Sequence, residues 1–324
     1  MSPDGWASCV QSADHEVEVV PDISVLPVVQ PRPRRWPRKV YLCVCAVAVL
    51  CVVDAFLVEP NWVKVRDVRI GDHPTLTVVH ISDLHHTRRR RAFLEKAVAR
   101  INRMDADLVC FTGDLTETTH DLAATEADLA DALEVLARIN RPLFGVPGNH
   151  DFWSGPPLEK IRACFRATGG AWLADESTVA LDGAVEITGL RGGGGASPPP
   201  QPATGPVTPA RHRILLVHLP AVAQRVDDGP FDLILAGHSH GGQVRVPFWG
   251  ALILPHGVGR WDRGLFQTPA GPLYVNPGLG TFFIGVRFLC RPEITVIRLG
   301  MSRVRAVSRS GHAAWERSVS TRVQ

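Results

Sequence analysis

Apolar residues along most of the chain fall in short runs separated by polar loops. Five runs rich in β-branched and aliphatic residues predict buried strands: Thr75–Ile81, Leu108–Thr112, Leu143–Val146, Arg213–Val217 and Phe231–Ala236. Apolar side chains at helical spacing predict helices over Ala92–Arg103 and within 121–140. Strands that alternate with helices in this way are typical of an α/β domain.

One apolar run is much longer than the others. Val40–Val58 is 19 residues long and contains one charged residue, Asp54. Because about 20 apolar residues cross the hydrocarbon core of a bilayer, this run predicts a transmembrane helix and a single-pass membrane protein. A buried helix of a soluble fold and a cleaved signal peptide are the alternatives. The basic flank disfavours the first, and the missing Ala-x-Ala motif disfavours the second.

Basic residues are more frequent before this run than after it. Lys64, Arg66 and Arg69 follow the run. Five basic residues precede it: Arg32, Arg34, Arg35, Arg38 and Lys39. Since positive residues concentrate on the cytoplasmic side, the excess favours a cytoplasmic N-terminus and an extracytoplasmic catalytic domain.

Composition completes the predicted organisation. With 324 residues, 45% of them hydrophobic, the chain is not wholly disordered and has room for a large core. A net charge of +3 does not indicate a specific nucleic-acid partner. The predicted parts are a disordered tail with a basic flank over 1–39, the transmembrane helix over 40–58, a domain over 62–299 and a basic tail over 300–324. The Gly- and Pro-rich segment 192–209 predicts a flexible insertion in that domain.

Each of the five predicted strands is followed directly by Asp, Asn or His. The clusters are Ser82-Asp83-Leu84-His85, Gly113-Asp114, Gly148-Asn149-His150-Asp151, His218 and Gly237-His238-Ser239-His240. Strand ends of open α/β sheets form the ligand crevice, so these side chains are expected to meet. Each cluster alone could be a surface turn or a core histidine, but five in order make those readings poor.

The residue types in these clusters favour metal binding. Carboxylate, amide and imidazole groups suit Mn²⁺, Fe²⁺ or Zn²⁺. The candidate ligands are Asp83, His85, Asp114, Asn149, His218, His238 and His240. They are too many for one tetrahedral ion, so the sequence predicts two divalent cations.

The order of these motifs resembles that of the calcineurin-like metallophosphoesterases over roughly residues 75–298. The segments Gly241-Gly242-Gln243 and Asn276–Thr281 are similar to those of a branch of bacterial membrane-associated phosphodiesterases. The resemblance implies a four-layer αββα sandwich after the transmembrane helix. It also implies two ion sites, the first made by Asp83, His85 and His240, the second by Asn149, His218 and His238, with Asp114 bridging both.

The resemblance also implies roles for residues beside the ligands. His150 is expected to protonate the leaving oxygen or to stabilise the transition state, with Asp151 orienting it. Arg88 and Arg89, which follow the first motif, are candidate phosphate contacts because guanidinium groups bind phosphate, and a solvated basic turn is the alternative. Five aromatic residues are candidates either for an apolar wall beside the metals or for the core: Trp249, Trp261, Phe266, Phe282 and Phe283.

Together these features predict a dimetal-dependent phosphoester hydrolase, foremost a phosphodiesterase, in which a metal-bridging hydroxide attacks phosphorus. The expected substrate is a phosphorylated small molecule or a lipid-linked compound near the membrane. The alternatives are a UDP-2,3-diacylglucosamine pyrophosphatase, and a phosphomonoesterase or protein phosphatase on the same scaffold. A non-enzymatic, metal-stabilised interaction domain is disfavoured because the ligand set is intact.

Overall fold

The structure is a computed structural model that describes residues 37–117, 121–153, 157–191, 210–226 and 231–301. The predicted insertion over 192–209 lies outside these residues, as do almost all of both predicted tails. By contacts, the chain divides into a unit from Met1 to Ala46 and a larger unit from Val47 to Gln324.

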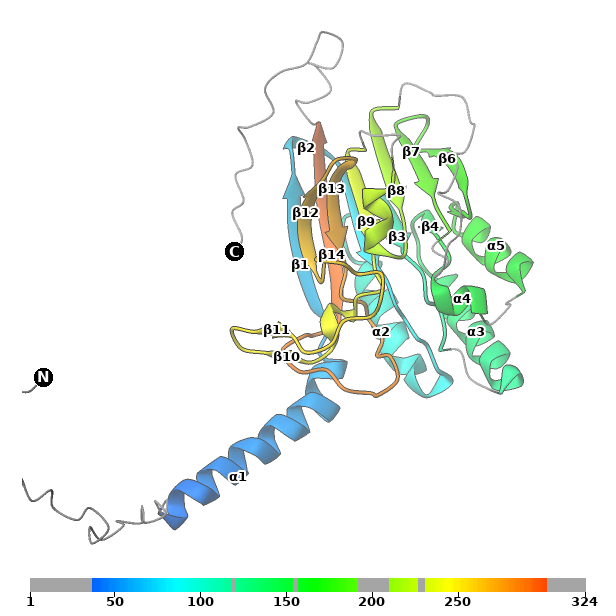
Figure 1. Cartoon of the computed structure of the whole chain (residues 1–324). Coiled ribbons are helices and arrows are strands. Elements are labelled where there is room, and N and C mark those ends of the chain that lie inside the picture. The colour runs from blue at the N-terminus through cyan, green and yellow to red at the C-terminus, as the bar shows by residue number, and fades with distance from the viewer. Residues whose placement is uncertain (1–36, 118–120, 154–156, 192–209, 227–230, 302–324) are drawn as a thin grey trace, which may run out of the picture. The chain divides into compact units, whose positions relative to one another are not determined.

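The larger unit is built on two six-stranded sheets (Figure 1). The first has the order β1 (Lys64–Ile70), β14 (Glu293–Met301), β2 (Asp72–Ile81), β3 (Leu108–Phe111), β4 (Leu143–Gly145) and β5 (Ala171–Trp172). The second has the order β12 (Gly264–Thr268), β13 (Gly271–Val275), β9 (Leu233–Ala236), β8 (His212–Leu216), β7 (Val185–Gly189) and β6 (Glu176–Ala180).

Most neighbouring strands are parallel, which places their carboxyl ends at one edge. In the first sheet β2, β3, β4 and β5 run parallel, and only β14 and β2 pair antiparallel. In the second sheet β13, β9, β8 and β7 run parallel, and the outer strands β12 and β6 are antiparallel. The five strands predicted from the sequence are all present, within three residues of the predicted bounds.

Both sheets are buried on both faces, which explains why the central strands are continuously apolar. Successive residues of a strand point to opposite faces. Val78 of β2 therefore packs between the sheets with Ile187 and Leu216, whereas Val79 packs under the helices. These helices are α2 (Arg91–Ile101), α3 (Leu122–Leu136) and α5 (Leu158–Ala167).

The outer face of the second sheet carries a thinner layer. Leu215 and Ile234 pack there against Trp261 and against Ala223 of the 3₁₀ helix η5 (Pro220–Gln224). The order of the layers is therefore helices, first sheet, second sheet, and a fourth layer made of a 3₁₀ helix and loops. This confirms the α/β sandwich expected from the sequence.

A long apolar helical segment precedes β1. It begins with α1 (Arg38–Val53), continues through a π-helical turn (Asp54–Val58) and ends in a 3₁₀ turn (Glu59–Asn61). Its 24 residues, Arg38–Asn61, are long and apolar enough to cross a membrane, and most of its side chains are exposed, although Ala55, Glu59 and Pro60 near its end are buried. This is the segment in which the sequence predicts a membrane span.

Candidate metal centre

The predicted ligand residues meet at the carboxyl ends of five strands. Asp83 and His85 follow β2, Asp114 follows β3, and Asn149 follows β4. His218 follows β8, and His238 and His240 follow β9 of the other sheet. Three groups of these side chains have ligand atoms within 4.8 Å of one another: Asp83, His85 and His240; His85, Asp114 and His150; and Asp114, His218 and His238.

The first group brings two imidazoles and a carboxylate together. Nε2 of His85 lies 3.1 Å from Nε2 of His240. Nε2 of His240 lies 3.5 Å from Oδ1 of Asp83. Both oxygens of Asp83 also accept the backbone N–H of His238 at 3.0 Å, which fixes the carboxylate plane.

A second group, made by His218, His238 and Asn149, converges on Nε2 of His218. This nitrogen is 3.1 Å from Nδ1 of His238 and 3.0 Å from Oδ1 of Asn149. Oδ2 of Asp114 lies between the two groups, 3.2 Å from Nε2 of His218 and 3.5 Å from Nε2 of His85. Its other oxygen accepts the backbone N–H of His150 at 2.9 Å. One carboxylate oxygen therefore faces both groups.

The outer ring nitrogens show how the imidazoles are oriented. Nδ1 of His218 donates to the carbonyl of Thr112 at 2.6 Å, and Nε2 of His238 donates to the carbonyl of His256 at 2.8 Å. Nδ1 of His85 lies 2.8 Å from Oε2 of Glu117. A metal-binding histidine commonly donates its second nitrogen to a carbonyl or carboxylate in this way, which leaves the first free to coordinate. The donor set therefore fits divalent cations.

The electrostatics of the groups agree with this fit. Burial, together with the charge of His218, lowers the pKa of His238 to about 4, so its imidazole is neutral at pH 7. Burial opposes protonation of His218 and His85, but nearby carboxylates together outweigh it, Asp114 and Asp83 for His218 and Asp114 and Glu117 for His85. They raise the pKa values to about 9 and about 10. A cation bound between these groups would replace those protons.

Backbone strain is concentrated at the same residues. Asp83, His85, Asp114, His238 and His240 all have positive φ, between 37° and 65°. Non-glycine residues rarely adopt this left-handed conformation, and where it persists it clusters at functional sites. Position 237, next to His238, can hold only glycine without a clash. A Cβ there would lie 1.9 Å from Oγ of Ser82 and 2.5 Å from Oδ2 of Asp83.

Asp151 holds the backbone of the centre. Its buried carboxylate accepts the N–H groups of Asp114, Leu115 and Gly148 at 2.8, 2.8 and 2.9 Å. It thereby ties the loop after β3 to the loop after β4. The orienting role toward His150 that the sequence resemblance implies stays a prediction.

Other predicted contacts lie around the centre. Arg88 pairs with Asp128 at 3.0 Å, and Arg89 is exposed, so their substrate contacts stay a prediction. Of the five aromatic candidates, Trp261 is core and Phe266 packs against the core. The ring of Phe282 lies 5.7, 5.3 and 6.0 Å from the rings of His85, His150 and His240, so it forms an apolar wall beside the centre.

Two residues of the centre were not predicted. Glu117 contacts His85, as described above, and its Oε1 lies 3.9 Å from Nδ1 of His150. Arg287 is fully buried and donates to the carbonyls of Pro277 at 2.8 Å, Gly280 at 3.0 Å and Cys290 at 3.0 Å. It fixes the loop whose Gly280 N–H bonds the Asp83 carbonyl at 2.7 Å. No motif in the sequence signals either role.

Comparison with known proteins identifies the family. The family model for calcineurin-like phosphoesterases matches residues 76–242, which is just over half of the chain. The chain belongs to the calcineurin-like phosphoesterase family. Members of this family are dimetal-dependent hydrolases of phosphoesters, so the chain is a metal-dependent phosphoester hydrolase.

Curated relatives extend the similarity beyond the family model. The uncharacterized metallophosphoesterase YkuE of Bacillus subtilis is 33% identical over 64% of this chain and 72% of its own length. Phosphodiesterase YaeI of Escherichia coli is 28% identical over 74% of this chain and 90% of its own length. UDP-2,3-diacylglucosamine pyrophosphatase LpxG of Chlamydia muridarum is 26% identical over 79% of this chain and 94% of its own length. YaeI and LpxG correspond to two of the functions that the sequence leaves open, a phosphodiesterase and a UDP-2,3-diacylglucosamine pyrophosphatase.

Proposed function

We propose that this protein is a membrane-anchored phosphodiesterase that holds two divalent cations, Mn²⁺, Fe²⁺ or Zn²⁺, at the centre described above. The position of Asp114 is the observation that carries the proposal. Its Oδ2 lies within 3.5 Å of a histidine nitrogen in each group, as a carboxylate shared by two ions requires. Asp83, His85 and His240 would hold one ion, and Asn149, His218 and His238 would hold the other.

When bound, such ions act as Lewis acids on phosphoryl oxygens and lower the pKa of bound water. The protein supplies the geometry. Ligands from both sheets fix the ion positions, and Asp83 is held by the N–H of His238. His150 is buried beside the centre, 4.8 Å between ring centroids from His85, where it can give a proton to the leaving oxygen.

The domain is proposed to span residues 62–299, anchored by the apolar segment at Arg38–Asn61 and exposed on the extracytoplasmic side. The excess of basic residues before the span supports this orientation. A reporter fused to the C-terminus tests it. Alkaline phosphatase activity supports it, and green fluorescence from a fused fluorescent protein contradicts it.

The catalytic proposal is tested on the full chain in detergent with added Mn²⁺. We expect faster hydrolysis of bis-p-nitrophenyl phosphate than of p-nitrophenyl phosphate. Asp114→Asn and His150→Ala should each lower the rate at least about a hundredfold, as loss of a ligand or a general acid does. His86→Gln is the matched control, because His86 is a buried imidazole that bonds Asp131 at 2.7 Å. Wild-type-like activity of either test variant would refute the assigned role.

A second candidate is favoured by the similarity to LpxG, which extends over 94% of that protein. The reaction would be hydrolysis of the pyrophosphate bond of UDP-2,3-diacylglucosamine. Release of UMP from that lipid at a rate above that of bis-p-nitrophenyl phosphate would support this candidate. Because nucleotide sugars are cytoplasmic, an extracytoplasmic C-terminus in the reporter assay would exclude it.

A further inference from the structure

Two loops near the metal centre expose large apolar side chains to solvent. The apolar loops comprise residues 246–253, which include the turn of the β10 (Arg245–Val246) and β11 (Gly250–Ala251) hairpin, and residues 282–284. Phe248 is fully exposed, Trp249 is 82% exposed and Phe283 is 88% exposed. Leu252, Ile253 and Ile284 are exposed beside them. Contiguous exposed apolar groups of this kind mark an interaction surface.

The apolar loops are held together, so their exposure is a built feature. The side chain of Gln243, which precedes the first loop, donates to the carbonyl of Phe282 at 3.0 Å and accepts its N–H at 2.5 Å. The N–H of Leu252 donates to the carbonyl of Val244, next to Gln243, at 3.0 Å. Phe248 and Phe283 have φ values of 66° and 61°. Because bulky residues rarely adopt this left-handed conformation, the fold presents these two rings at a cost in backbone energy.

The apolar loops are continuous with the end of the apolar helix. The segment that follows residues 282–284 is hydrogen-bonded to that helix, because the backbone N–H of Arg287 donates to the carbonyl of Ala55 at 2.9 Å. The Glu59 carboxylate accepts the N–H groups of Leu289, at 2.7 Å, and Cys290. A span that ends at Asn61 places these residues at the level of the lipid headgroups, where aromatic side chains are favoured.

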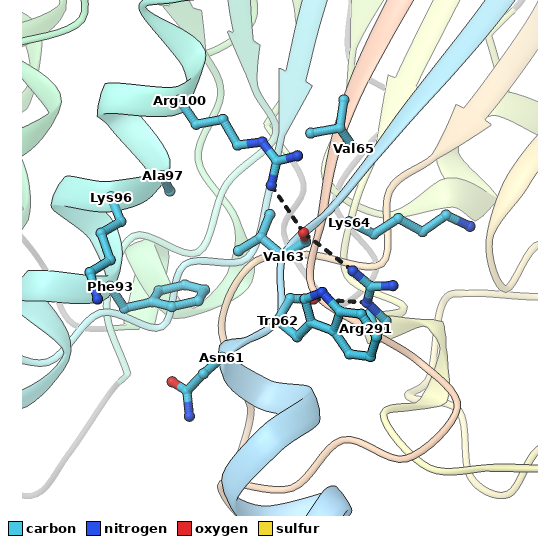
Figure 2. A pocket seen from close by; sticks show the side chains of 10 residues that line it. All are labelled: Asn61, Trp62, Val63, Lys64, Val65, Phe93, Lys96, Ala97, Arg100 and Arg291. Atoms are coloured by element: carbon cyan, nitrogen blue, oxygen red, sulfur yellow. Dashed lines mark hydrogen bonds between the residues drawn. The ribbon is translucent and has the colours of Figure 1, made fainter.

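A basic cavity also adjoins the end of the helix (Figure 2). It has a volume of about 470 Å³ and is lined by Trp62, Phe93 and four cations: Lys64, Lys96, Arg100 and Arg291. The guanidinium groups of Arg100 and Arg291 donate to the Val63 carbonyl at 3.2 and 3.4 Å, and Arg291 lies 3.8 Å above the Trp62 ring. Among the described residues, no carboxylate forms an ion pair with any of the four. Their charge therefore complements anionic phosphate headgroups.

Phe282 belongs to the apolar loops and also lies beside the metal centre. Its ring lies beside the rings of His85, His150 and His240, and its centroid is 6.1 Å from that of the exposed Phe283 ring. An acyl chain that lies along Phe283 would thus meet the Phe282 ring, which lies beside the metal centre.

We propose that the apolar loops insert into the bilayer leaflet beside the span, and that the substrate is a phosphorylated amphiphile drawn from that leaflet. Its phosphate would occupy the metal centre and its chains would follow Phe282 and Phe283 toward the lipid. This inference rests on the proposed hydrolase function and membrane anchor. A bilayer is favoured over a partner protein because the segment after the apolar loops and the basic cavity both adjoin the end of an apolar helix.

Insertion is tested by fluorescence of the full chain in vesicles of phosphatidylcholine and phosphatidylglycerol with brominated acyl chains. Bromine quenches an indole that touches the chains. Trp249→Phe should remove part of the quenchable fluorescence, whereas Trp172→Phe, which replaces an indole only 3% exposed, should not. An unchanged quenchable fraction in Trp249→Phe would overturn the proposal, as would a stable dimer that covers Trp249.

Substrate delivery is tested with the double variant Phe248→Ser and Phe283→Ser in the same vesicles. Hydrolysis of an embedded fluorescent phosphodiester lipid should fall at least about tenfold, because two inserted rings are lost. Hydrolysis of soluble bis-p-nitrophenyl phosphate should stay within about twofold of wild type, because neither residue belongs to the metal centre. Equal losses on both substrates, or none on the lipid, would overturn the proposal. If the wild type hydrolyses neither, the proposed function fails, and the quenching result still decides whether the loops insert.

Discussion

Replacing Asp151 by Asn separates a structural role of this residue from a role in proton transfer. The carboxylate accepts three backbone N–H groups with its two oxygens, from Asp114 and Gly148 on Oδ2 and from Leu115 on Oδ1. An amide has one oxygen, so the best orientation keeps two of these bonds and turns an NH₂ group toward the third N–H. The variant therefore leaves one buried donor unsatisfied and removes the charge from the other two bonds.

The cost follows from these bonds. A hydrogen bond to a charged group contributes about 1.5–3 kcal/mol, a neutral one about 1 kcal/mol, and an unsatisfied buried donor costs about 1–3 kcal/mol. Loss of the charge weakens the two retained bonds by about 1–4 kcal/mol together, and the unsatisfied donor costs about 1–3 kcal/mol, so the free energy of unfolding should fall by roughly 2–7 kcal/mol. A typical domain has about 5–15 kcal/mol, so the variant should still fold over most of this range.

The loss should appear as weaker metal binding, because Asp151 positions the backbone of Asp114. Disturbing the partners of a metal ligand lowers affinity about 10–100-fold. We therefore expect the Mn²⁺ concentration for half-maximal hydrolysis of bis-p-nitrophenyl phosphate to rise by that factor. The rate at saturating Mn²⁺ should stay within about threefold of wild type. Asp131→Asn is the matched control, since Asp131 bonds His86 and Arg91 away from the centre.

The opposite pattern would refute this reasoning. An unchanged Mn²⁺ dependence with a large fall in the saturated rate would mean that Asp151 acts through His150, as the sequence resemblance implies. A free energy of unfolding equal to that of wild type would refute the hydrogen-bond argument itself.

Three further variants test other parts of the structure. Gly237→Ala should lower metal affinity at least about tenfold, measured by calorimetric titration, because its Cβ would clash with Ser82 and Asp83. Arg287→Met should lower the free energy of unfolding by roughly 4 kcal/mol in urea titrations, because it leaves buried carbonyls unsatisfied. Burial lowers the pKa of His80 from 6.5 to about 3. Between pH 6.5 and about pH 3 only the unfolded chain binds this proton. The free energy of unfolding therefore decreases by about 1.4 kcal/mol for each unit by which the pH is lowered in this range. In metal-free protein, His80→Leu should reduce this slope by about 1.4 kcal/mol per pH unit, which corresponds to one proton. A slope equal to that of wild type would contradict the lowered pKa of His80.

The parts of the fold that follow from local pattern were predictable. The strand Thr75–Ile81 is rich in β-branched and apolar residues and appears as the carboxyl-terminal part of β2, which is Asp72–Ile81. The other strands, β14 among them, were not predicted, because their place in the sheets depends on distant partners. β14 pairs with both β1 and β2, which lie more than two hundred residues earlier, and such a register is set by the assembled core.

The same distinction holds at the metal centre. The rule that ligands gather at strand ends predicted the convergence of the Asp83, Asp114 and His218 motifs, because topology alone fixes it. The contacts of Glu117 and Arg287 depend on side-chain directions and on carbonyls of other loops, which carry no sequence signature. The Gly-Asn-His-Asp motif was predicted to supply a metal ligand and catalytic groups. Its last residue, Asp151, accepts three backbone N–H groups instead of showing only a catalytic contact.

The geometry of the centre also couples metal binding to the sandwich itself. Asp83, His85, Asp114 and Asn149 extend from the first sheet, and His218, His238 and His240 from the second. Five of these residues are held at positive φ, which costs about 1–3 kcal/mol each. That strain persists because Asp151 and Arg287 fix the surrounding backbone with buried hydrogen bonds. Cations bound between the groups would link the edges of both sheets through residues already in position. The strained ligands are therefore best understood as preorganised, so binding energy need not be used to bring the two sheets together.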